Sequence, residues 1–157
     1  MLDLRPDHIV NVSSISHYDA PTSFDFEKHL MGLQEDYDAF EAYGGTKLVV
    51  LMMTFHQARL LGPLGIRCNS CDPGTVSTKM LEQGWPGCPG IPVSAANDEY
   101  LLCTDPRWKD KTGLYLVGNE VHRGSPIAYD EREQEKVFGI LEKLTGLSFP
   151  SKIKFLQ

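Results

Sequence analysis

The chain has 157 residues, of which 41% are hydrophobic and 23% charged, a composition ordinary for a soluble globular protein and a length sufficient for one domain with a core. Its formal net charge of −6, without a block of lysine or arginine, argues against a nucleic-acid partner, because such a partner requires a basic face. No apolar run approaches the roughly 20 residues of a transmembrane helix, and the first residues do not resemble a signal peptide, so we expect a cytoplasmic protein.

The four cysteines, Cys68, Cys71, Cys88 and Cys103, do not predict a metal site. Cys68 and Cys71 have the two-residue gap found in many zinc sites. They lie, however, in a segment with the pattern of a β-strand, where residues three apart point to opposite faces. We therefore expect reduced, buried thiols and no bound metal.

The first predicted element is a buried strand from His8 to Ser14, which is short, apolar and β-branched. Ser13 and Ser14 stand at its carboxyl end, the edge at which open α/β sheets bind ligands. A long connection, residues 15–40, follows, with a short helix predicted around Phe26 to Leu33. Connections of this length in compact domains are usually functional or partly mobile.

A buried helix is predicted from Ala42 to Leu60. Gly44 and Gly45 weaken it locally and allow another backbone, or a ligand, to come close. Tyr43 and Lys47 are four residues apart, so they share one face of the helix. A neighbouring ammonium favours the phenolate, which would let Tyr43 transfer a proton near neutral pH. The alternative is a packed tyrosine followed by a solvated lysine.

A second strand, Gly65 to Cys71, leads directly into an exposed turn, Asp72 to Thr78. The segment 77–92 is rich in glycine and proline and also carries the apolar side chains Met80, Leu81 and Trp85. Flexible backbone with apolar side chains predicts a lid over an apolar ligand. The alternative is a surface loop whose apolar side chains cover the edge of the core.

The remaining predicted elements are a helix from Ser94 to about Cys103, a strand from Thr112 to Val117 and a last helix from Glu131 to Thr145. Asp130 is placed to cap the last helix, and Gly146 follows its end. The alternation of strands and helices predicts an α/β fold with parallel strands, formed as one domain.

Three of these stretches, taken together, resemble the C-terminal half of a short-chain dehydrogenase/reductase. They are Ile9 to Ser14, Tyr43 to Lys47 and Asp72 to Thr78. The long gap between the first two, and Gly113-Leu114-Tyr115-Leu116 before the last helix, are most similar to the retinol-dehydrogenase-like and WW-domain-oxidoreductase branch. The resemblance implies a partial Rossmann-like, doubly wound parallel sheet of about three strands with flanking helices across residues 1–157.

The same resemblance implies hydride transfer between NAD or NADP and a small apolar alcohol or carbonyl substrate. Tyr43 matches the catalytic tyrosine, Lys47 the lysine that promotes its ionisation and bonds the nicotinamide ribose, and Ser14, rather than Ser13, the serine that holds the substrate oxygen. The residues matching the family's cofactor contacts are Tyr43, Lys47, Pro73, Gly74, Val76 and Thr78. Many members dimerise through the helix that carries the tyrosine, which implies a homo-oligomer through Ala42 to Leu60.

The chain also departs from the family pattern. It lacks the glycine-rich dinucleotide turn and the asparagine of the catalytic tetrad, and Asp72 stands where this branch often has histidine. A truncated, non-catalytic relative without the cofactor cradle is therefore the alternative hypothesis. A serine hydrolase using Ser14 with one of the histidines at 17, 29, 56 and 122 is weaker, because no glycine-x-serine-x-glycine pattern surrounds Ser14.

Overall fold

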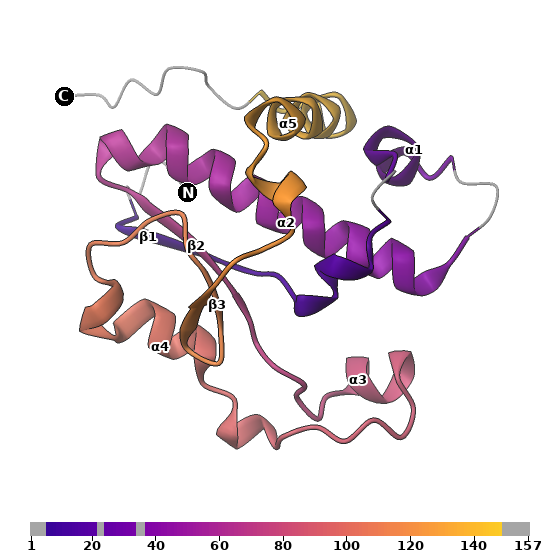
Figure 1. Ribbon diagram of the computed structural model, residues 1–157, viewed down its shortest axis with the longest axis vertical. Helices are drawn as coiled ribbons and strands as arrows, with labels where there is room; N and C mark the ends of the chain where they lie inside the picture. The colour runs from indigo at the N-terminus through magenta and orange to yellow at the C-terminus, as the bar shows by residue number, and fades with distance from the viewer. Residues whose placement is uncertain (1–5, 22–23, 34–36, 149–157) are drawn as a thin grey trace.

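The computed structural model describes residues 6–21, 24–33 and 37–148, which are built around a four-stranded sheet (Figure 1). The strands lie side by side in the order β1 (His8–Val12), β2 (Arg67–Asp72), β3 (Tyr115–Val117) and β4 (Glu120–His122). The first three run parallel, whereas β4 is antiparallel to β3. The predicted α/β class with three parallel strands is confirmed.

Helices cover both faces of this sheet, which gives three layers. α2 (Ala39–Leu61) crosses one face and α4 (Asp98–Thr104) lies on the other (Figure 1). Cys68 of β2 packs against the end of α2, and Cys71 packs against α4. Both thiols are free and buried, as their spacing on a strand predicts. Burial raises the pKa of Cys68 to about 11 and, with help from nearby carboxylates, that of Cys71 to about 12.

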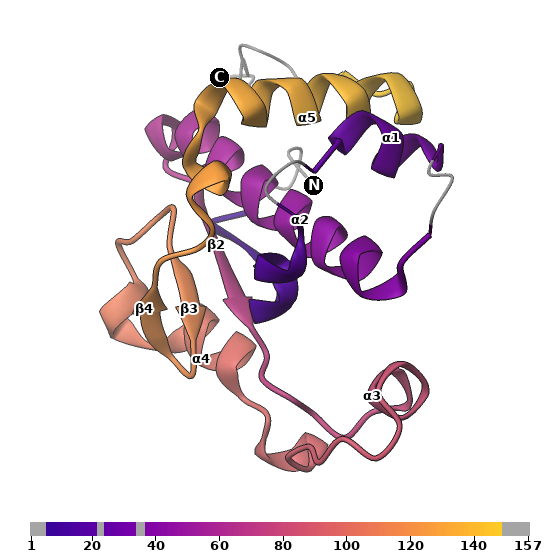
Figure 2. The same cartoon turned by 45° about the vertical axis from the view of Figure 1, so that its right-hand side comes forward.

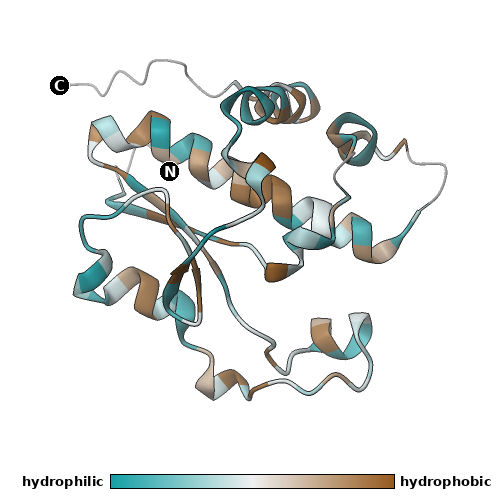
Figure 3. Cartoon of the chain, viewed as in Figure 1, coloured by the Kyte–Doolittle hydropathy of each residue, from teal (hydrophilic) through white to brown (hydrophobic). Residues whose placement is uncertain are grey.

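The long helix α2 is buried, as predicted, because apolar layers lie on both sides of it. Leu51 and Met52 are fully buried, and Figure 3 shows apolar residues along much of its length. The helix begins at Ala39 and not at Ala42, since the Asp38 carboxylate accepts hydrogen bonds from the N–H groups of the first turn at 2.8 and 2.9 Å.

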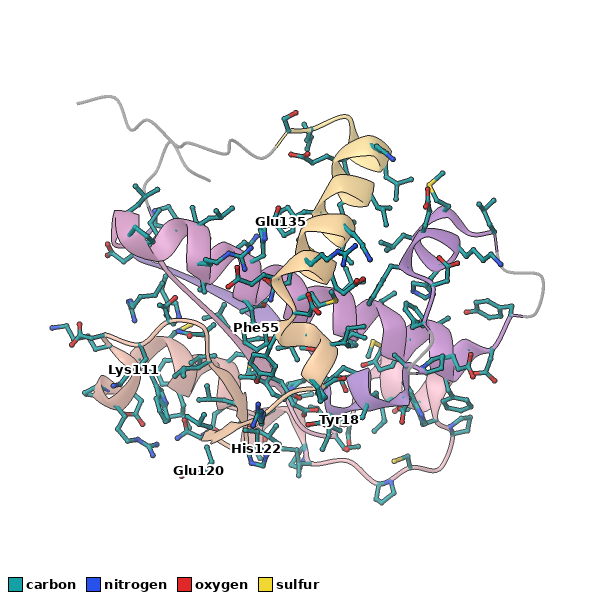
Figure 4. All side chains as sticks on the ribbon, turned by 45° about the horizontal axis from the view of Figure 1, so that its top comes forward. Tyr18, Phe55, Lys111, Glu120, His122 and Glu135 are labelled. Atoms are coloured by element: carbon teal, nitrogen blue, oxygen red, sulfur yellow. The ribbon has the colours of Figure 1, made fainter. Side chains whose placement is uncertain are left out.

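Two further helices, α1 (Phe26–Met31) and α5 (Glu131–Thr145), lie over the outer side of α2. α5 has the predicted bounds, because Asp130 accepts from two N–H groups of the first turn and the left-handed Gly146 ends it. Arg59 of α2 donates to Gln134 and Glu135 of α5 at 2.7 and 2.8 Å (Figure 4). The homo-oligomer expected through α2 stays a prediction.

The fourth strand was not predicted. A two-residue turn, Gly118-Asn119, joins β3 to β4, and both residues have positive φ, 57° and 60° (Figure 2). This is the geometry of a tight hairpin whose twist matches the flanking strands. Two predicted strands also start too early, because Gly65 and Gly113 have left-handed φ values of 79° and 73°, which are incompatible with a regular strand.

The segment 77–92 is partly helical. α3 (Lys79–Gly84) lies beyond the end of the sheet (Figures 1 and 2), and Trp85, which follows it, packs against Phe40 and Tyr43 of α2. The ends of the segment are joined, since Ser77 N–H donates to the Ile91 carbonyl and Ile91 N–H to Thr75, at 2.9 and 2.8 Å. The helix predicted with Ser94 as its cap instead has Asn97 at the cap position, three residues later, and starts at Asp98, because Ala96 is extended and Asn97 lies outside the helical region.

Within the described ranges, no helix is both long enough and apolar enough to cross a membrane. The same part of the chain contains no group of three or more histidine, cysteine, aspartate or glutamate side chains arranged to hold a metal ion.

Candidate active site

The two adjacent serines at the end of β1 have different environments. Ser13 is buried, and its hydroxyl donates to the Lys47 carbonyl at 2.8 Å. Ser14 is half-buried and lines a cavity; its Oγ accepts a hydrogen bond from the Ser16 N–H at 3.2 Å. Ser13 therefore fastens β1 to α2, and Ser14 is the serine whose hydroxyl a ligand could contact.

Tyr43 and Lys47 lie on the same side of α2, near Ser14. The Lys47 amine is 5.6 Å from the centre of the Tyr43 ring and donates to the Val12 carbonyl at 3.2 Å. Burial lowers the pKa of Lys47, while the negative charge of Asp72 acts in the opposite direction. Lys47 thus places a positive charge beside the tyrosine at the carboxyl end of β1.

The two glycines after Tyr43 let other segments approach α2 closely, as predicted. A Cβ at Gly44 would lie 2.6 Å from the Ser16 carbonyl oxygen, and one at Gly45 would lie 2.1 Å from the ring of Phe24. The 3-10 helix that follows Ser14, Ile15–Asp19, therefore rests directly on the first turns of α2. This contact brings Ser14 and Tyr43 to one site.

Asp72 organises the loops around the site, a role that the sequence analysis missed. Its carboxylate is buried and accepts hydrogen bonds from the N–H of Ile15 and from the N–H of Gly74, the latter at 2.5 Å. One side chain thus joins the loop after β1 to the turn after β2. An aspartate followed by Pro-Gly at a strand end is a typical side-chain-to-backbone turn, and this signal was present in the sequence.

The turn after β2 forms another wall of the cavity through Pro73, Gly74, Val76 and Thr78. Val76 forms an isolated parallel bridge with Ile91. Thr78 caps α3 by accepting a hydrogen bond from the Leu81 N–H at 3.3 Å. The turn is therefore fixed both to the far end of the 77–92 segment and to the start of its helix.

All of these groups meet at one cavity of about 850 Å³. Ser14, Tyr43 and the four residues of the turn after β2 line it, whereas Lys47 stands just behind Tyr43. Its apolar lining includes Met80, Leu81, Trp85, Val93 and Val117. The volume is within the range of small-molecule sites, about 300–1,000 Å³.

Trp85, from the 77–92 segment, packs edge-to-face on Tyr43 with 5.1 Å between ring centres. It also approaches Phe40 at 6.0 Å. A second hollow of about 710 Å³ lies beyond these rings and shares Tyr43, Met80 and Trp85 with the first. The 77–92 segment therefore contributes apolar side chains on both sides of the tyrosine.

His17, which lies close to Ser14 in the chain, cannot act as a general base for the Ser14 hydroxyl. His17 is fully buried, and its Nδ1 lies 2.7 Å from the Ser14 backbone carbonyl, not from Oγ. Its Nε2 accepts a hydrogen bond from the Ser125 N–H at 3.0 Å. Both ring nitrogens are occupied in holding loops together, which removes the support for a Ser14–His17 hydrolase.

No family model matches the sequence, but two human proteins are similar to it. Polyprenol dehydrogenase is 26% identical over 155 residues, which cover 88% of this chain and 45% of that protein. Retinol dehydrogenase 13 is 25% identical over 163 residues, which cover 93% of this chain and 48% of that protein. The chain therefore spans about half the length of both relatives.

Solved structures show the same fold. A Mycobacterium paratuberculosis protein superposes with a TM-score of 0.66 at 22% identity, covering 92% of this chain and 52% of the other. The 3-oxoacyl-[acyl-carrier protein] reductase of Brucella melitensis superposes with a TM-score of 0.50 at 23% identity, covering 75% of this chain and 42% of the other.

Proposed function

We propose that this chain forms the proton-transfer and substrate-holding part of an NAD(P)-dependent oxidoreductase site of the short-chain dehydrogenase/reductase type. The proposal is supported by the sequence similarity to two human proteins, each matched over about half its length, and by the fold shared with a 3-oxoacyl-[acyl-carrier protein] reductase. The substrate is an apolar alcohol or carbonyl compound. The observation that carries the proposal is that Ser14, Tyr43 and the turn after β2 line a single apolar cavity. Both human relatives are dehydrogenases by name.

Each polar residue has a role that its position permits. The Tyr43 hydroxyl gives a proton to the substrate oxygen during reduction and accepts it during oxidation. The Ser14 hydroxyl donates a hydrogen bond to the same oxygen, where negative charge develops. Lys47, whose amine lies 5.6 Å from the Tyr43 ring centre, stabilises the phenolate that remains after proton donation.

The residues present fit the nicotinamide end of a cofactor. Gly74 has a φ of 75° and leaves open space where a side chain would stand, so a flat ring can approach the backbone of this turn. Pro73, Val76 and Thr78 would hold the ring at that wall of the cavity. When bound, NAD or NADP supplies or receives the hydride at the substrate carbon.

The segment 77–92 is the proposed lid. Its two ends are hydrogen-bonded together, and α3 lies beyond the end of the sheet (Figure 2). Met80, Leu81 and Trp85 already line the cavity. A small movement of the segment about its hydrogen-bonded ends would close these side chains onto a bound substrate and exclude water, which favours an apolar substrate.

The first test combines cofactor binding with a tyrosine variant. Saturable binding of NADH or NADPH is measured by energy transfer from tryptophan, and turnover is assayed with decanal. Tyr43→Phe should lower the turnover rate by about 100-fold to 10,000-fold, because it removes the proton donor, while cofactor binding stays within a factor of about two.

The matched control is Tyr100→Phe, since Tyr100 lies on α4, is 68% exposed and is not part of the cavity lining. This variant should keep full activity. Turnover that survives Tyr43→Phe would refute the catalytic role of Tyr43. A folded chain that binds neither cofactor at millimolar concentration would instead favour the non-catalytic alternative.

A further inference from the structure

The charged side chains that line the cavity are all acidic. They are Asp72 and Glu99, and the lining residues include no lysine, arginine or histidine. Asp98, beside Glu99 at the start of α4, adds a third carboxylate close by. The amine of Lys47 donates to the Val12 carbonyl, and Lys47 is not among the lining residues.

The two lining carboxylates differ in whether hydrogen bonds from the protein stabilise their negative charge. Asp72 accepts two backbone hydrogen bonds, from Ile15 and Gly74. Glu99 is half-buried and takes part in no hydrogen bond or ion pair among the residues that the structure describes. Its negative charge is therefore available to act on whatever occupies the cavity.

The negative charges of these carboxylates raise the pKa of neighbouring groups. Burial raises the pKa of Asp98, and the charges of Glu99 and Asp72 raise it further. The pKa of Cys71, raised mainly by burial, is raised further by Glu99, Asp98 and Asp72. A second negative charge brought into this cavity would meet the same unfavourable potential.

We propose that Glu99 is a specificity-determining residue that makes the cavity reject substrates carrying a carboxylate and accept uncharged alcohols or carbonyl compounds. The inference rests on the proposed function, since it takes this cavity as the substrate site. Two like charges a few ångströms apart at a partly buried protein site repel strongly enough to weaken binding by about tenfold or more. The apolar lining from Met80, Leu81 and Trp85 receives the rest of the substrate.

The test uses ligands that share a long hydroxyl-bearing alkyl chain and carry a negative, a neutral or a positive group at the other end. The full chain is titrated with ω-hydroxydecanoate, with its methyl ester and with the corresponding ω-amino alcohol. Binding is followed by tryptophan fluorescence, to which Trp85 in the cavity lining contributes. The ester and the amine should bind at least about tenfold more tightly than the carboxylate. The difference should shrink from about 0.01 M to about 1 M salt, as screening increases.

In the Glu99→Gln variant, the affinity for the carboxylate ligand should come to within about twofold of the affinity for the ester. The matched control is Glu27→Gln, which removes the same charge from an exposed position on α1 outside the cavity lining, and it should leave the discrimination unchanged. Saturable binding of all three ligands with equal affinity would overturn the charge selection but leave the proposed function standing. Failure of all three to bind would contradict the substrate cavity itself, and both proposals with it.

Discussion

At the scale of single residues, the geometry of the site depends on Gly44 having no Cβ atom. Gly44 directly follows Tyr43, and a Cβ there would lie 2.6 Å from the Ser16 carbonyl oxygen and 3.1 Å from the Ala20 nitrogen. Both neighbours are backbone atoms, which cannot rotate away. Any side chain at this position must therefore push the loop after β1 away from α2, and Ser14 moves with that loop.

Gly44→Ala should lower the free energy of unfolding by about 1–3 kcal/mol, the usual cost of overpacking a buried contact. It should also weaken ligand binding in the cavity, because Ser14 and Tyr43 would separate. Urea denaturation measures the first effect, and the fluorescence titration measures the second.

Gly139→Ala provides the control. Gly139 lies in the middle of α5, and a Cβ there meets nothing within 4 Å. Alanine is a better helix former than glycine, so this variant should gain about 0.5–1 kcal/mol without any change in ligand binding. If Gly44→Ala were as stable as Gly139→Ala, the close contact between the loop and α2 would be wrong.

At the scale of elements, the start of α2 sets the position of Tyr43. Asp38 caps the helix by accepting hydrogen bonds from the N–H groups of Phe40 and Glu41. Tyr43 stands on the second turn, so fraying of the first turn would reach it. The cap thus links a local sequence signal to the geometry of the site.

Asp38→Ala should lower the free energy of unfolding by about 1 kcal/mol, the typical value of an N-cap. Asp130→Ala removes the equivalent cap from α5, far from the cavity, and should have a similar effect on stability. Only Asp38→Ala should weaken ligand binding. Equal binding by both variants would show that the first turn of α2 does not position Tyr43.

The same element shows where sequence reasoning succeeds and fails. The bounds of α5 were predictable because Asp130 and Gly146 signal both ends. The start of α2 was predicted three residues late, because Gly44 and Gly45 weaken the helix pattern near its start, whereas the signal that sets the start is the capping residue Asp38. The strand β4 was missed although Gly118-Asn119 is a recognised hairpin signal.

The contents of the site were predictable to the extent that they follow from chain order. Parallel strands end at one edge of a sheet, so the serines after β1 and the turn after β2 had to be neighbours. The roles of Asp72, His17 and Glu99 could not be derived in that way. The bond from Ile15 to Asp72, the bond from Ser125 to His17 and the place of Glu99 in the cavity lining all depend on how segments distant in sequence pack together.

At the scale of the whole molecule, three histidines accept hydrogen bonds that require their neutral form, two of them between separate elements and one within α2. His8 accepts from Asn69 at 2.8 Å, His17 from Ser125 at 3.0 Å and His56 from Arg59 at 3.1 Å. An imidazolium has no free lone pair and could accept none of these bonds. The three contacts join β1 to β2, the loop after β1 to the C-terminal arm, and the outer side of α2 to its own last turn.

Stability should therefore fall as the pH falls below about 6.5. Burial lowers the pKa of all three histidines, that of His8 to about 4 with a further contribution from Arg67. Because the unfolded chain binds these protons at higher pH than the folded chain, its relative free energy drops on acidification. The loss begins near the unfolded value of about 6.5 and continues towards pH 4.

Urea denaturation between pH 7.5 and about 5 measures this slope, in a window where ordinary carboxylates stay ionised. His17→Gln removes one of the titrating groups and should flatten the slope, even though it also lowers stability at neutral pH. His122→Gln is the control, because this side chain is exposed on β4 and should leave the slope as it is. A free energy of unfolding that stays constant from pH 7.5 to 5 would mean that the three histidines are not held neutral, and that the contacts between these elements do not depend on their lone pairs.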